Sequence, residues 1–578
     1  MTAPLLPAQL PLAPGAAARA RKLGLGRDGG RFDTASGVLA RVARTAARTP
    51  ERTAVVDGES ALTYAWLLAR VDQFRTVLRA AGCGAGTVVA AVGDRSADTI
   101  AAFLALEHLG AVYLPIAPDW PAQRVGQVLA RSGAGLLLDY SGDPGGGGPR
   151  GRTAVQAAAE LGTTTVAAPG DGTSGPDALV PASFAADTAG PDARTPASLA
   201  ADAPDRSLEP RYCIFTSGTT GRPKGASVEH RGMMNHLWAK VEDLGLTEAD
   251  RLAFTAPLVF DISVWQMLAP LLVGGTVVVV REPELAFPRR LTNVLERSGV
   301  TVVELVPTVV GWITDQAERR TGVTLPALRW LISTGEELHT GLAARFLAAA
   351  PHIRLLNAYG PTECSDDITH HEVTAPDTGR PRLPVGAPVT GARLYLLVRE
   401  DGGRWRAADP GEAGELFVGG VVVGLGYLND PDNNAAAFFA DPFDQDSPTG
   451  RLYRTGDLAR FEDGVVHYLG RVDRQVKVAG VRMELDEIEV VLRRHPAVDE
   501  CAVVVPVVDG RPELAAYYTL LDPVPAEELR TYLADSLPEA MVPRRLTELD
   551  ALPLTQNGKT DHRALRQLTQ DGTTPAKV

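Results

Sequence analysis

The chain is poor in cysteine and has no long apolar run. Only four cysteines occur among 578 residues, at positions 83, 213, 364 and 501, and no two of them form a C-x-x-C pair. This spacing argues against a zinc site or a disulfide framework and favours a reducing, cytoplasmic location. No apolar stretch reaches the roughly 20 residues of a membrane span. The first 30 residues place their basic side chains after their apolar ones, the reverse of a secretory signal.

An excess of positive charge is also missing. The 57 lysines and arginines are outnumbered by 70 aspartates and glutamates, which leaves a net charge of −13. Nucleic acids and anionic membranes repel such a protein, so we expect neither as a partner. A polyphosphate ligand would have to be met by cations placed locally.

One segment has the composition of a polyphosphate-binding loop. Residues 216–225 read TSGTTGRPKG and follow a short apolar stretch that predicts a buried strand. Glycines let backbone N–H groups approach phosphate oxygens, hydroxyls add donors, and a lysine adds a mobile positive charge. The pattern is not a Walker A motif, because glycine follows the lysine. The residues expected to hold ATP here are Thr216, Ser217, Gly218, Thr219, Thr220 and Lys224.

The chain divides into segments of different character. Alternating strand and helix patterns predict an α/β layered core over residues 36–472. Residues 1–35 are rich in proline and alanine and are expected to form a flexible tail. Residues 134–208 contain four consecutive glycines and little periodicity, which predicts a mobile low-complexity insertion. The pattern restarts at residue 473 and predicts a small α+β domain to residue 566, followed by a polar tail over 567–578.

Four further motifs occur in a fixed order: NAYGPTE at 357–363, YRTGDL at 453–458, GRVDRQVK at 470–477 and NGK at 557–559. With the glycine-rich loop, they resemble the adenylate-forming superfamily, and most closely the amino-acid adenylation domains of nonribosomal peptide synthetases. The resemblance covers about residues 36–566. It implies a large core, a C-terminal lid that rotates between two poses, ATP and Mg²⁺ as cofactors, and transfer of the acyl group to phosphopantetheine on a carrier protein.

The resemblance also assigns roles to individual residues. Lys559 and Lys224 would offset the charges of carboxylate and phosphate, and Glu363 would serve Mg²⁺. For several of these residues an ordinary structural role remains a competitor: a solvated lysine, a buried strand-end tyrosine, a turn-forming aspartate. The remaining assignments are Asn357, Ala358, Tyr359 and Gly360 for adenine, Thr362 for phosphate, Asp457 and Arg471 for ribose or phosphate, Asp473 for the hinge, and Gly480 for the pantetheine tunnel.

A substrate pocket can be carried over in the same way. Its aspartate at position 261 would pair with the α-ammonium of an amino acid, which a fatty or aryl acid lacks. Three more acids predict a cationic substrate side chain, and the bulk of Trp265 a short one: 2,4-diaminobutyrate first, then ornithine, with arginine or lysine last. A hydroxylated amino acid stays open. The pocket comprises Phe260, Asp261, Ile262, Trp265, Glu304, Ile332, Thr334, Ala358, Asp366 and Asp367, with Lys559.

Together these features predict a stand-alone, ATP-dependent, AMP-forming ligase. It would activate an amino acid as aminoacyl-AMP and load it in trans on a carrier protein, because neither end of the chain has room for a condensation or carrier domain. The resemblance also admits a small MbtH-like accessory protein. Two alternatives remain: an acyl- or aryl-CoA ligase of the same fold, which Asp261 opposes, and a catalytically silent nucleotide-binding or scaffolding relative.

Overall fold

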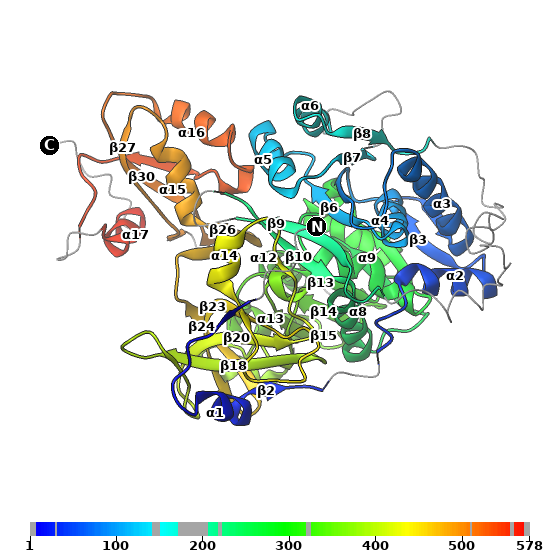
Figure 1. Ribbon diagram of the computed structural model, residues 1–578, viewed down its shortest axis with the longest axis horizontal. Coiled ribbons are helices and arrows are strands. Elements are labelled where there is room, and N and C mark those ends of the chain that lie inside the picture. The colour runs from blue at the N-terminus through cyan, green and yellow to red at the C-terminus, as the bar shows by residue number, and fades with distance from the viewer. Residues whose placement is uncertain are drawn as a thin grey trace.

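The protein consists of a large core and a smaller C-terminal lid, seen in a computed structural model (Figure 1). The lid lies at the upper left of this view, beside α5, and a third, strand-rich part of the core lies below it. The structure describes residues 7–28, 32–141, 151–170, 206–217, 222–319, 325–508, 511–554 and 560–570.

Two sheets with helices between and outside them form most of the core. A cluster of buried side chains from both sheets and from the intervening helices makes the central hydrophobic layer, and two further clusters lie on the outer faces. Parallel strands covered on both faces are continuously apolar, as in β12, whose four residues are all buried. The predicted α/β class is therefore confirmed.

The seven-stranded sheet has the order β21-β10-β9-β6-β5-β7-β8, and the nine-stranded sheet the order β17-β16-β15-β14-β13-β11-β12-β3-β4. The strands of the first are β5 (Val88–Val92), β6 (Val112–Ile116), β7 (Leu136–Asp139), β8 (Thr164–Ala167), β9 (Pro210–Thr216), β10 (Lys224–Glu229) and β21 (Gly426–Tyr427). Those of the second are β3 (Thr53–Asp57), β4 (Ser60–Thr63), β11 (Arg251–Phe254), β12 (Thr276–Val279), β13 (Val302–Leu305), β14 (Trp330–Ser333), β15 (Arg354–Tyr359), β16 (Thr369–Val373) and β17 (Ala387–Pro388).

The helices fall into three layers. Those between the sheets are α2 (Val38–Arg48), α3 (Tyr64–Ala80), α4 (Ala97–Leu109), α8 (His230–Leu244) and α9 (Ile262–Leu272). Those outside the seven-stranded sheet are α5 (Ala122–Ser132) and α6 (Arg152–Glu160). Those outside the nine-stranded sheet are α10 (Glu282–Leu285), α11 (Pro288–Arg297), α12 (Pro307–Arg319) and α13 (Thr340–Ala349).

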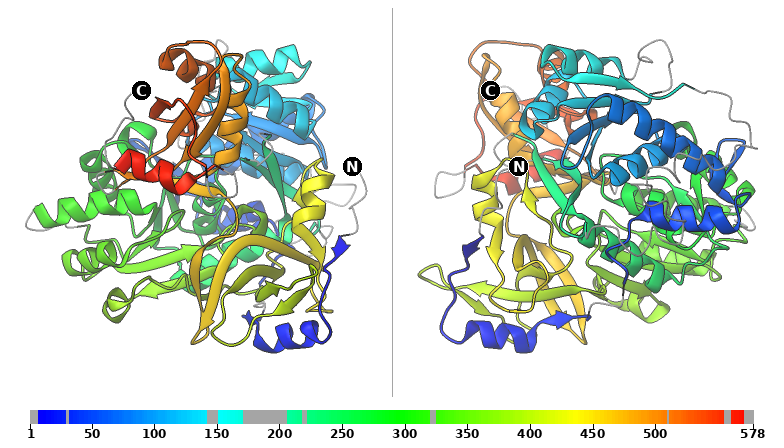
Figure 2. Two further views of the ribbon diagram at one scale, coloured as in Figure 1. Left: turned by 90° about the vertical axis from the view of Figure 1, so that its left-hand side faces the viewer. Right: turned by 45° about the vertical axis from the view of Figure 1, so that its right-hand side comes forward.

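The expected N-terminal tail is ordered over residues 7–28, which corrects that prediction. Its strand β1 pairs with β22 and its strand β2 with β18, so the segment lies along a third, eight-stranded sheet. Leu10 and Ala20 are buried against that sheet, and Figure 2 shows α1 at its foot. Sporadic apolar residues in a proline-rich segment gave no periodic signal for this packing. The elements are β1 (Ala8–Gln9), α1 (Ala16–Leu23), β2 (Leu25–Gly26), β18 (Ala392–Arg399), β19 (Trp405–Ala407), β20 (Gly414–Gly420), α14 (Pro431–Ala437), β22 (Phe438–Ala440), β23 (Arg451–Glu462) and β24 (Val465–Arg471).

The predicted insertion over residues 134–208 also needs correction. Strands β7 and β8 add to the edge of the seven-stranded sheet in parallel register, and α6, which connects them, packs on the outer face of that sheet through Ala154, Ala157 and Ala158. The alanine-rich composition that suggested low complexity is in part a tightly packed helix. The remainder of that segment, residues 142–150 and 171–205, lies outside the described residues.

The lid has a hydrophobic core of its own, built from its sheet β27-β30-β31 and from α15 and α16. A separate hairpin, β25–β26, precedes it and extends toward the large domain. The domain boundary predicted at residue 473 falls between β24 and this hairpin. The elements are β25 (Gln475–Val478), β26 (Val481–Glu484), α15 (Leu485–Arg493), β27 (Val498–Val504), β28 (Val507–Val508), β29 (Arg511–Pro512), β30 (Ala515–Leu520), α16 (Ala526–Ala534), β31 (Arg545–Glu548) and α17 (His562–Gln570).

The helices of the described segments and the four cysteines bear on membrane insertion and disulfide formation. None of the helices in the described segments has the length and apolar character to cross a membrane. All four cysteines are buried free thiols.

The packing of the N-terminal segment can be tested by truncating a single side chain. Leu10 is 5% exposed, so Leu10→Ala should destabilise the large domain by about 2–5 kcal/mol, as other buried leucine truncations do. Chemical denaturation followed by tryptophan fluorescence measures the change. Leu161→Ala, at a position 50% exposed, is the matched control. If the two variants are equally stable, the N-terminal segment does not pack as described and the prediction of a flexible tail stands.

Candidate active site

The predicted site residues gather where parallel strands of the nine-stranded sheet end. Glu304 on β13 is in register with Ile332 on β14, and Ala358 lies near the end of β15. Open α/β sheets bind ligands beyond these carboxyl ends. The N-terminus of α9 adds Asp261, and Trp265 follows one helical turn later on the same face. Apart from Ile262 and Phe260, the described residues of the predicted substrate pocket are buried.

Asp261 is poised for a positively charged ligand group. Its carboxylate is 8% exposed and accepts the Ile262 N–H at 3.0 Å. Burial raises the pKa of Asp261, and a hydrogen bond from Thr362 opposes that rise. Among the described residues none forms an ion pair with it within 4 Å, but the charge of Lys477 on the lid hairpin also opposes the rise in its pKa. Thr362, expected at the phosphate, therefore contacts the substrate end of the site.

The three extra acids have a cationic partner that sequence reasoning missed. Lys240, on α8 and fully buried, places Nζ 2.5 Å from Asp367 Oδ2 and 3.6 Å from Glu304 Oε1. Its ammonium also lies 4.6 Å from the centre of the Trp265 ring. The chain itself therefore supplies one cation to an acid cluster for which only a substrate cation was expected. A periodic signal existed, because Lys240 lies on the buried stripe of α8 with Met233, Leu237 and Leu244.

One buried lysine does not neutralise all of this acid cluster. Burial raises the pKa of Glu304 to about 7 despite the nearby Lys240, and burial with the Asp367 charge raises that of Asp366. Burial would also raise the pKa of Asp367, but Lys240 and His370 hold it well below its usual range. The remaining neighbour, His236, lies 3.2 Å from Asp366 Oδ2, and burial lowers its pKa to about 3. The cluster is thus kept partly protonated.

Two carboxylate oxygens in this pocket lack a hydrogen-bond donor. Glu304 Oε1 and Asp366 Oδ2 are buried, and neither accepts a hydrogen bond from the described residues. The other oxygen of Glu304 accepts from Trp265 Nε1 at 2.5 Å, and Thr334 donates to Asp367 Oδ1 at 3.3 Å. Unsatisfied buried acceptors are costly, so a donor-bearing ligand group would stabilise this pocket.

The phosphate-loop lysine is engaged by the lid. Lys224 begins β10, is 8% exposed, and lies 3.6 Å from Glu484 Oε1 at the end of β26. Ser217 donates to the Arg482 carbonyl at 3.2 Å. Thr216 is buried at the end of β9. Gly218, Thr219 and Thr220 lie outside the described residues.

Glu363 is a buried carboxylate held by one cation and one hydroxyl group. It is 1% exposed and accepts from Arg482 Nη1 at 2.8 Å and from the Tyr427 hydroxyl at 2.7 Å. Burial would raise its pKa, but the Arg482 charge and hydrogen bond lower it to about 2. A single ionised carboxylate beside a phosphate loop fits Mg²⁺, which prefers few protein ligands and phosphate oxygens. Arg482 holds that carboxylate in the pose seen.

The residues expected at the nucleoside end of the site form hydrogen bonds with one another. The Tyr359 hydroxyl donates to Asp457 Oδ2, and Arg471 donates to Asp457 Oδ1 at 2.7 Å. Arg471 also binds Asp473 Oδ1 at 2.6 Å, which ties the predicted ribose site to the predicted hinge. Asn357 donates to the Pro384 carbonyl at 2.8 Å, so its amide N–H holds a neighbouring loop and leaves only its oxygen for adenine. Next to this cluster, a Cβ on Gly360 would lie 2.0 Å from the Asp366 carbonyl oxygen.

The tip of the lid hairpin lies against the core. Gly480 donates to Glu336 Oε1 at 2.7 Å, and with φ of +78° a Cβ there would lie 2.7 Å from Val306 Cγ1. Only glycine fits this approach. Lys559, the predicted catalytic lysine, lies outside the described residues.

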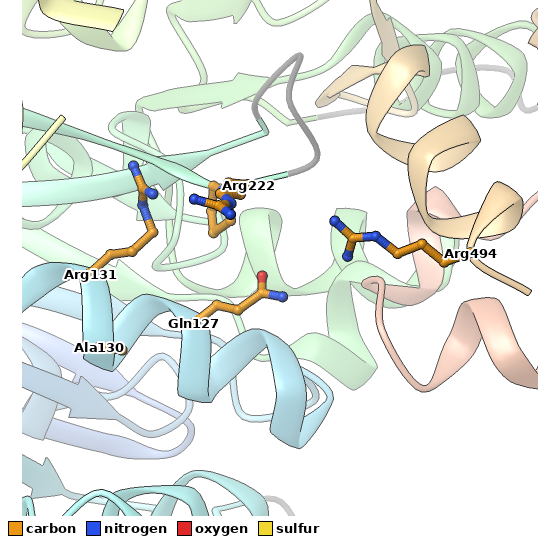
Figure 3. Close-up of a pocket in the computed structure, with 6 residues that line it drawn as sticks. Gln127, Ala130, Arg131, Arg222 and Arg494 are labelled. Atoms are coloured by element: carbon orange, nitrogen blue, oxygen red, sulfur yellow. The ribbon is translucent and has the colours of Figure 1, made fainter. Parts of the chain in front are cut away.

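A groove lined by cations opens between core and lid. It has a volume of about 310 Å³ and lies between α5, the residues that follow the phosphate loop, and the end of α15. Figure 3 shows Arg131 and Arg222 on the core side and Arg494 across from them on the lid. Arg131 is ion-paired with Asp430 at 2.6 Å, so the positive charge at this groove comes mainly from Arg222 and Arg494.

Comparison with known families decides what kind of site this is. A family described as AMP-binding enzyme matches residues 42–428, and its C-terminal domain matches residues 487–559. The chain belongs to the AMP-binding enzyme family. It is accordingly an ATP-dependent, AMP-forming ligase, and the resemblance to the adenylate-forming superfamily is confirmed.

Relatives of this AMP-binding enzyme include units of peptide synthetases. The phosphinothricin tripeptide synthetase PhsB of Streptomyces viridochromogenes is 36% identical over 90% of this chain and 41% of its own length. Tyrocidine synthase 2 of Brevibacillus parabrevis is 33% identical over 91% of this chain and 13% of its own length. The chain thus spans well under half of these relatives, which are larger proteins.

Solved structures agree with the fold. Holo-PA1221, a nonribosomal peptide synthetase protein containing adenylation and carrier (PCP) domains, has a TM-score of 0.75 at 27% identity and covers 92% of this chain and 85% of its own. The Vibrio cholerae adenylation domain AlmE, solved with glycyl-adenosine-5'-phosphate, has a TM-score of 0.75 at 24% identity, which shows the shared fold, and covers 94% of this chain and 99% of its own.

The contact between Arg482 and Glu363 of this AMP-binding enzyme can be tested by removing the charge. Arg482→Met should slow transfer to a pantetheine thiol at least about tenfold, because loss of a buried ion pair depopulates the lid pose seen. ATP–pyrophosphate exchange should fall much less, since that half-reaction needs Glu363 free for metal. Arg544→Met, at an exposed lid position, is the control. An equal loss in both half-reactions would contradict this role.

Proposed function

We propose that this AMP-binding enzyme activates an α-amino acid as aminoacyl-AMP and loads it on the phosphopantetheine thiol of a carrier protein. The observation that carries the proposal is Asp261: a buried carboxylate at a helix N-terminus that forms no ion pair within 4 Å among the described residues, although the more distant charge of Lys477 acts on it. An α-ammonium would form that ion pair. Relatives that belong to peptide synthetases support it.

In the first half-reaction, a substrate carboxylate oxygen attacks the α-phosphorus of ATP and pyrophosphate leaves. Asp261 orients the amino group, Lys224 neutralises phosphate charge, and Tyr359 with Asp457 holds the nucleoside. Mg²⁺ bound at Glu363 would shield the charge of the leaving pyrophosphate. Lys559 is proposed to bridge carboxylate and phosphate as the lid closes.

In the second half-reaction, the thiol attacks the acyl carbon and AMP leaves. We take the pose described here as the one suited to this step, since Arg482 and Glu484 of β26 lie at the phosphate end and Gly480, which lies against the core, is expected to border the pantetheine arm. In the pose described here, Arg482 and Glu484 are the partners of Glu363 and Lys224, the residues that would hold the metal and the phosphate in the first half-reaction. The separate, trans-acting carrier, an MbtH-like accessory protein and a hinge at Asp473 stay predictions.

The substrate proposed is an amino acid with a short cationic side chain, with 2,4-diaminobutyrate ahead of ornithine. The support is more specific than the number of acidic residues in the pocket. Glu304 Oε1 and Asp366 Oδ2 are buried acceptors without donors among the described residues, and a second ammonium would satisfy both. A hydroxylated amino acid could donate only one hydrogen bond per hydroxyl and would leave the charge uncompensated.

A panel assay tests the substrate class. Pyrophosphate exchange with the twenty common amino acids, ornithine and diaminobutyrate should be strongest for the short diamino acids, and free coenzyme A should not replace the carrier as acceptor. Glu304→Gln should raise the KM for the diamino acid by at least about tenfold and leave that for ATP within about twofold. Preference for an apolar amino acid, or efficient formation of a coenzyme A thioester, would contradict the proposal.

The acidity of Glu304 predicts a pH dependence. Its pKa near 7 means that the carboxyl is protonated below pH 7 and ionised above it, and a cationic side chain binds only the ionised form well. The KM for the diamino acid should therefore fall as pH rises from 6 to 7.5, by up to about tenfold per unit below the pKa. Glu304→Gln should flatten the profile. Hydrogen bonds with Asp243 and Asp367 raise the pKa of His370. His370 would titrate in both the wild type and Glu304→Gln, so the difference between the two profiles reports the titration of Glu304.

A further inference from the structure

A buried ammonium group occupies the deep end of the substrate pocket. Lys240 Nζ lies between Asp367 and Glu304, over the ring of Trp265. All four side chains are at most 2% exposed. Burial would lower the pKa of Lys240, but the charges of Asp367 and Glu304 raise it above its usual value, so the group is charged.

We propose that Lys240 is a specificity-determining residue: an internal cation that closes the side-chain pocket and restricts cationic substrates to short chains. This rests on the proposed function, and deepens it by assigning the length limit to one side chain. Lys240 acts by occupying the acid pair that the ammonium of a longer substrate would otherwise reach.

The dimensions of the pocket follow from α9. Asp261, which receives the α-ammonium, and Trp265 are separated by one helical turn, a rise of about 5.4 Å. Lys240 sits over the Trp265 ring, so its ammonium marks the far end of that span. A side-chain ammonium of lysine or ornithine directed to this end would meet a like charge in a buried environment, where repulsion is strong.

The near side of the same cluster remains available to a shorter substrate. Trp265 donates to Glu304 Oε2 and Lys240 donates to Asp367 Oδ2. Glu304 Oε1, 3.6 Å from Lys240 Nζ, and Asp366 Oδ2, 3.2 Å from His236 Nε2, accept no hydrogen bond from the described residues. The chain itself thus supplies the hydrogen bond of Asp367 and leaves these two oxygens as acceptors for a short side-chain ammonium.

Titratable groups from several elements surround Lys240. They come from α8, β13, the segment before β16, and β16 itself. They are His236, Glu304, Asp366, Asp367 and His370, with Asp261 at the near end and Asp243 behind His370.

The test compares substrate profiles of the full chain. Lys240→Met keeps the length of the side chain and removes its charge, and should raise the ratio of kcat/KM for lysine to that for diaminobutyrate at least about tenfold. Because the single change leaves Asp367 buried without its cation, the double variant Lys240→Met/Asp367→Asn removes both charges and guards against loss of folding. Lys240→Arg retains the cation and is the matched control, expected to keep the preference for short chains.

Calorimetric titration of the same proteins with diaminobutyrate, ornithine and lysine gives the comparison without catalysis. A ratio unchanged from wild type in the folded double variant, by both exchange and calorimetry, overturns the role of Lys240. The wild-type profile alone tests the substrate class. If wild type prefers a neutral amino acid but the double variant gains affinity for lysine, the substrate proposal fails and the role of Lys240 stands.

Discussion

The cleft between the two domains is organised by the cost of burying a carboxylate without a cation. Glu363 is almost completely buried, and Arg482 keeps its pKa low in the pose seen, so a cation must accompany this carboxylate wherever it is ionised. Here Arg482 of the lid hairpin does so, and Glu484 of the same hairpin faces Lys224. A hairpin that carries both signs can replace metal and phosphate together. Lid position and occupancy of the phosphate site would then be linked by electrostatics, and that linkage would order the two half-reactions that we propose.

The same rule operates in the substrate pocket, with a different outcome. The acidic residues near Trp265 outnumber the one lysine that the chain supplies. Two of these acidic residues have raised pKa values, and each has an oxygen that accepts no hydrogen bond from the described residues. Such a pocket is incomplete without a ligand that carries donors and positive charge. The amino-acid end and the phosphate end are thus both charge-balanced only in part by the protein, and Thr362, in contact with Asp261 beside Glu363, joins them.

Sequence reasoning succeeded where residues in linear motifs make the site and failed where partners come from unrelated segments. The family and the α/β class followed from motifs and apolar runs. Lys240 was missed because nothing in its local sequence marks it, although its place on the buried stripe of α8 was readable. The N-terminal segment was misjudged because its apolar residues match a sheet edge that only the fold creates. Closed pairs such as Arg482 with Glu363 depend on the lid pose, which no sequence pattern encodes.

Movement of the lid with ligand can be followed by one distance. The native cysteines are all buried, so nitroxide labels at Leu161→Cys on the core and Leu521→Cys on the lid, positions 50% and 64% exposed, can be placed selectively. Pulsed electron paramagnetic resonance would then measure their separation. If Glu363 exchanges Arg482 for metal, Mg²⁺ with a non-hydrolysable ATP analogue should shift the distance distribution, and Arg482→Met should produce part of that shift without ligand. A distribution that stays the same under saturating Mg²⁺ and nucleotide would contradict the account.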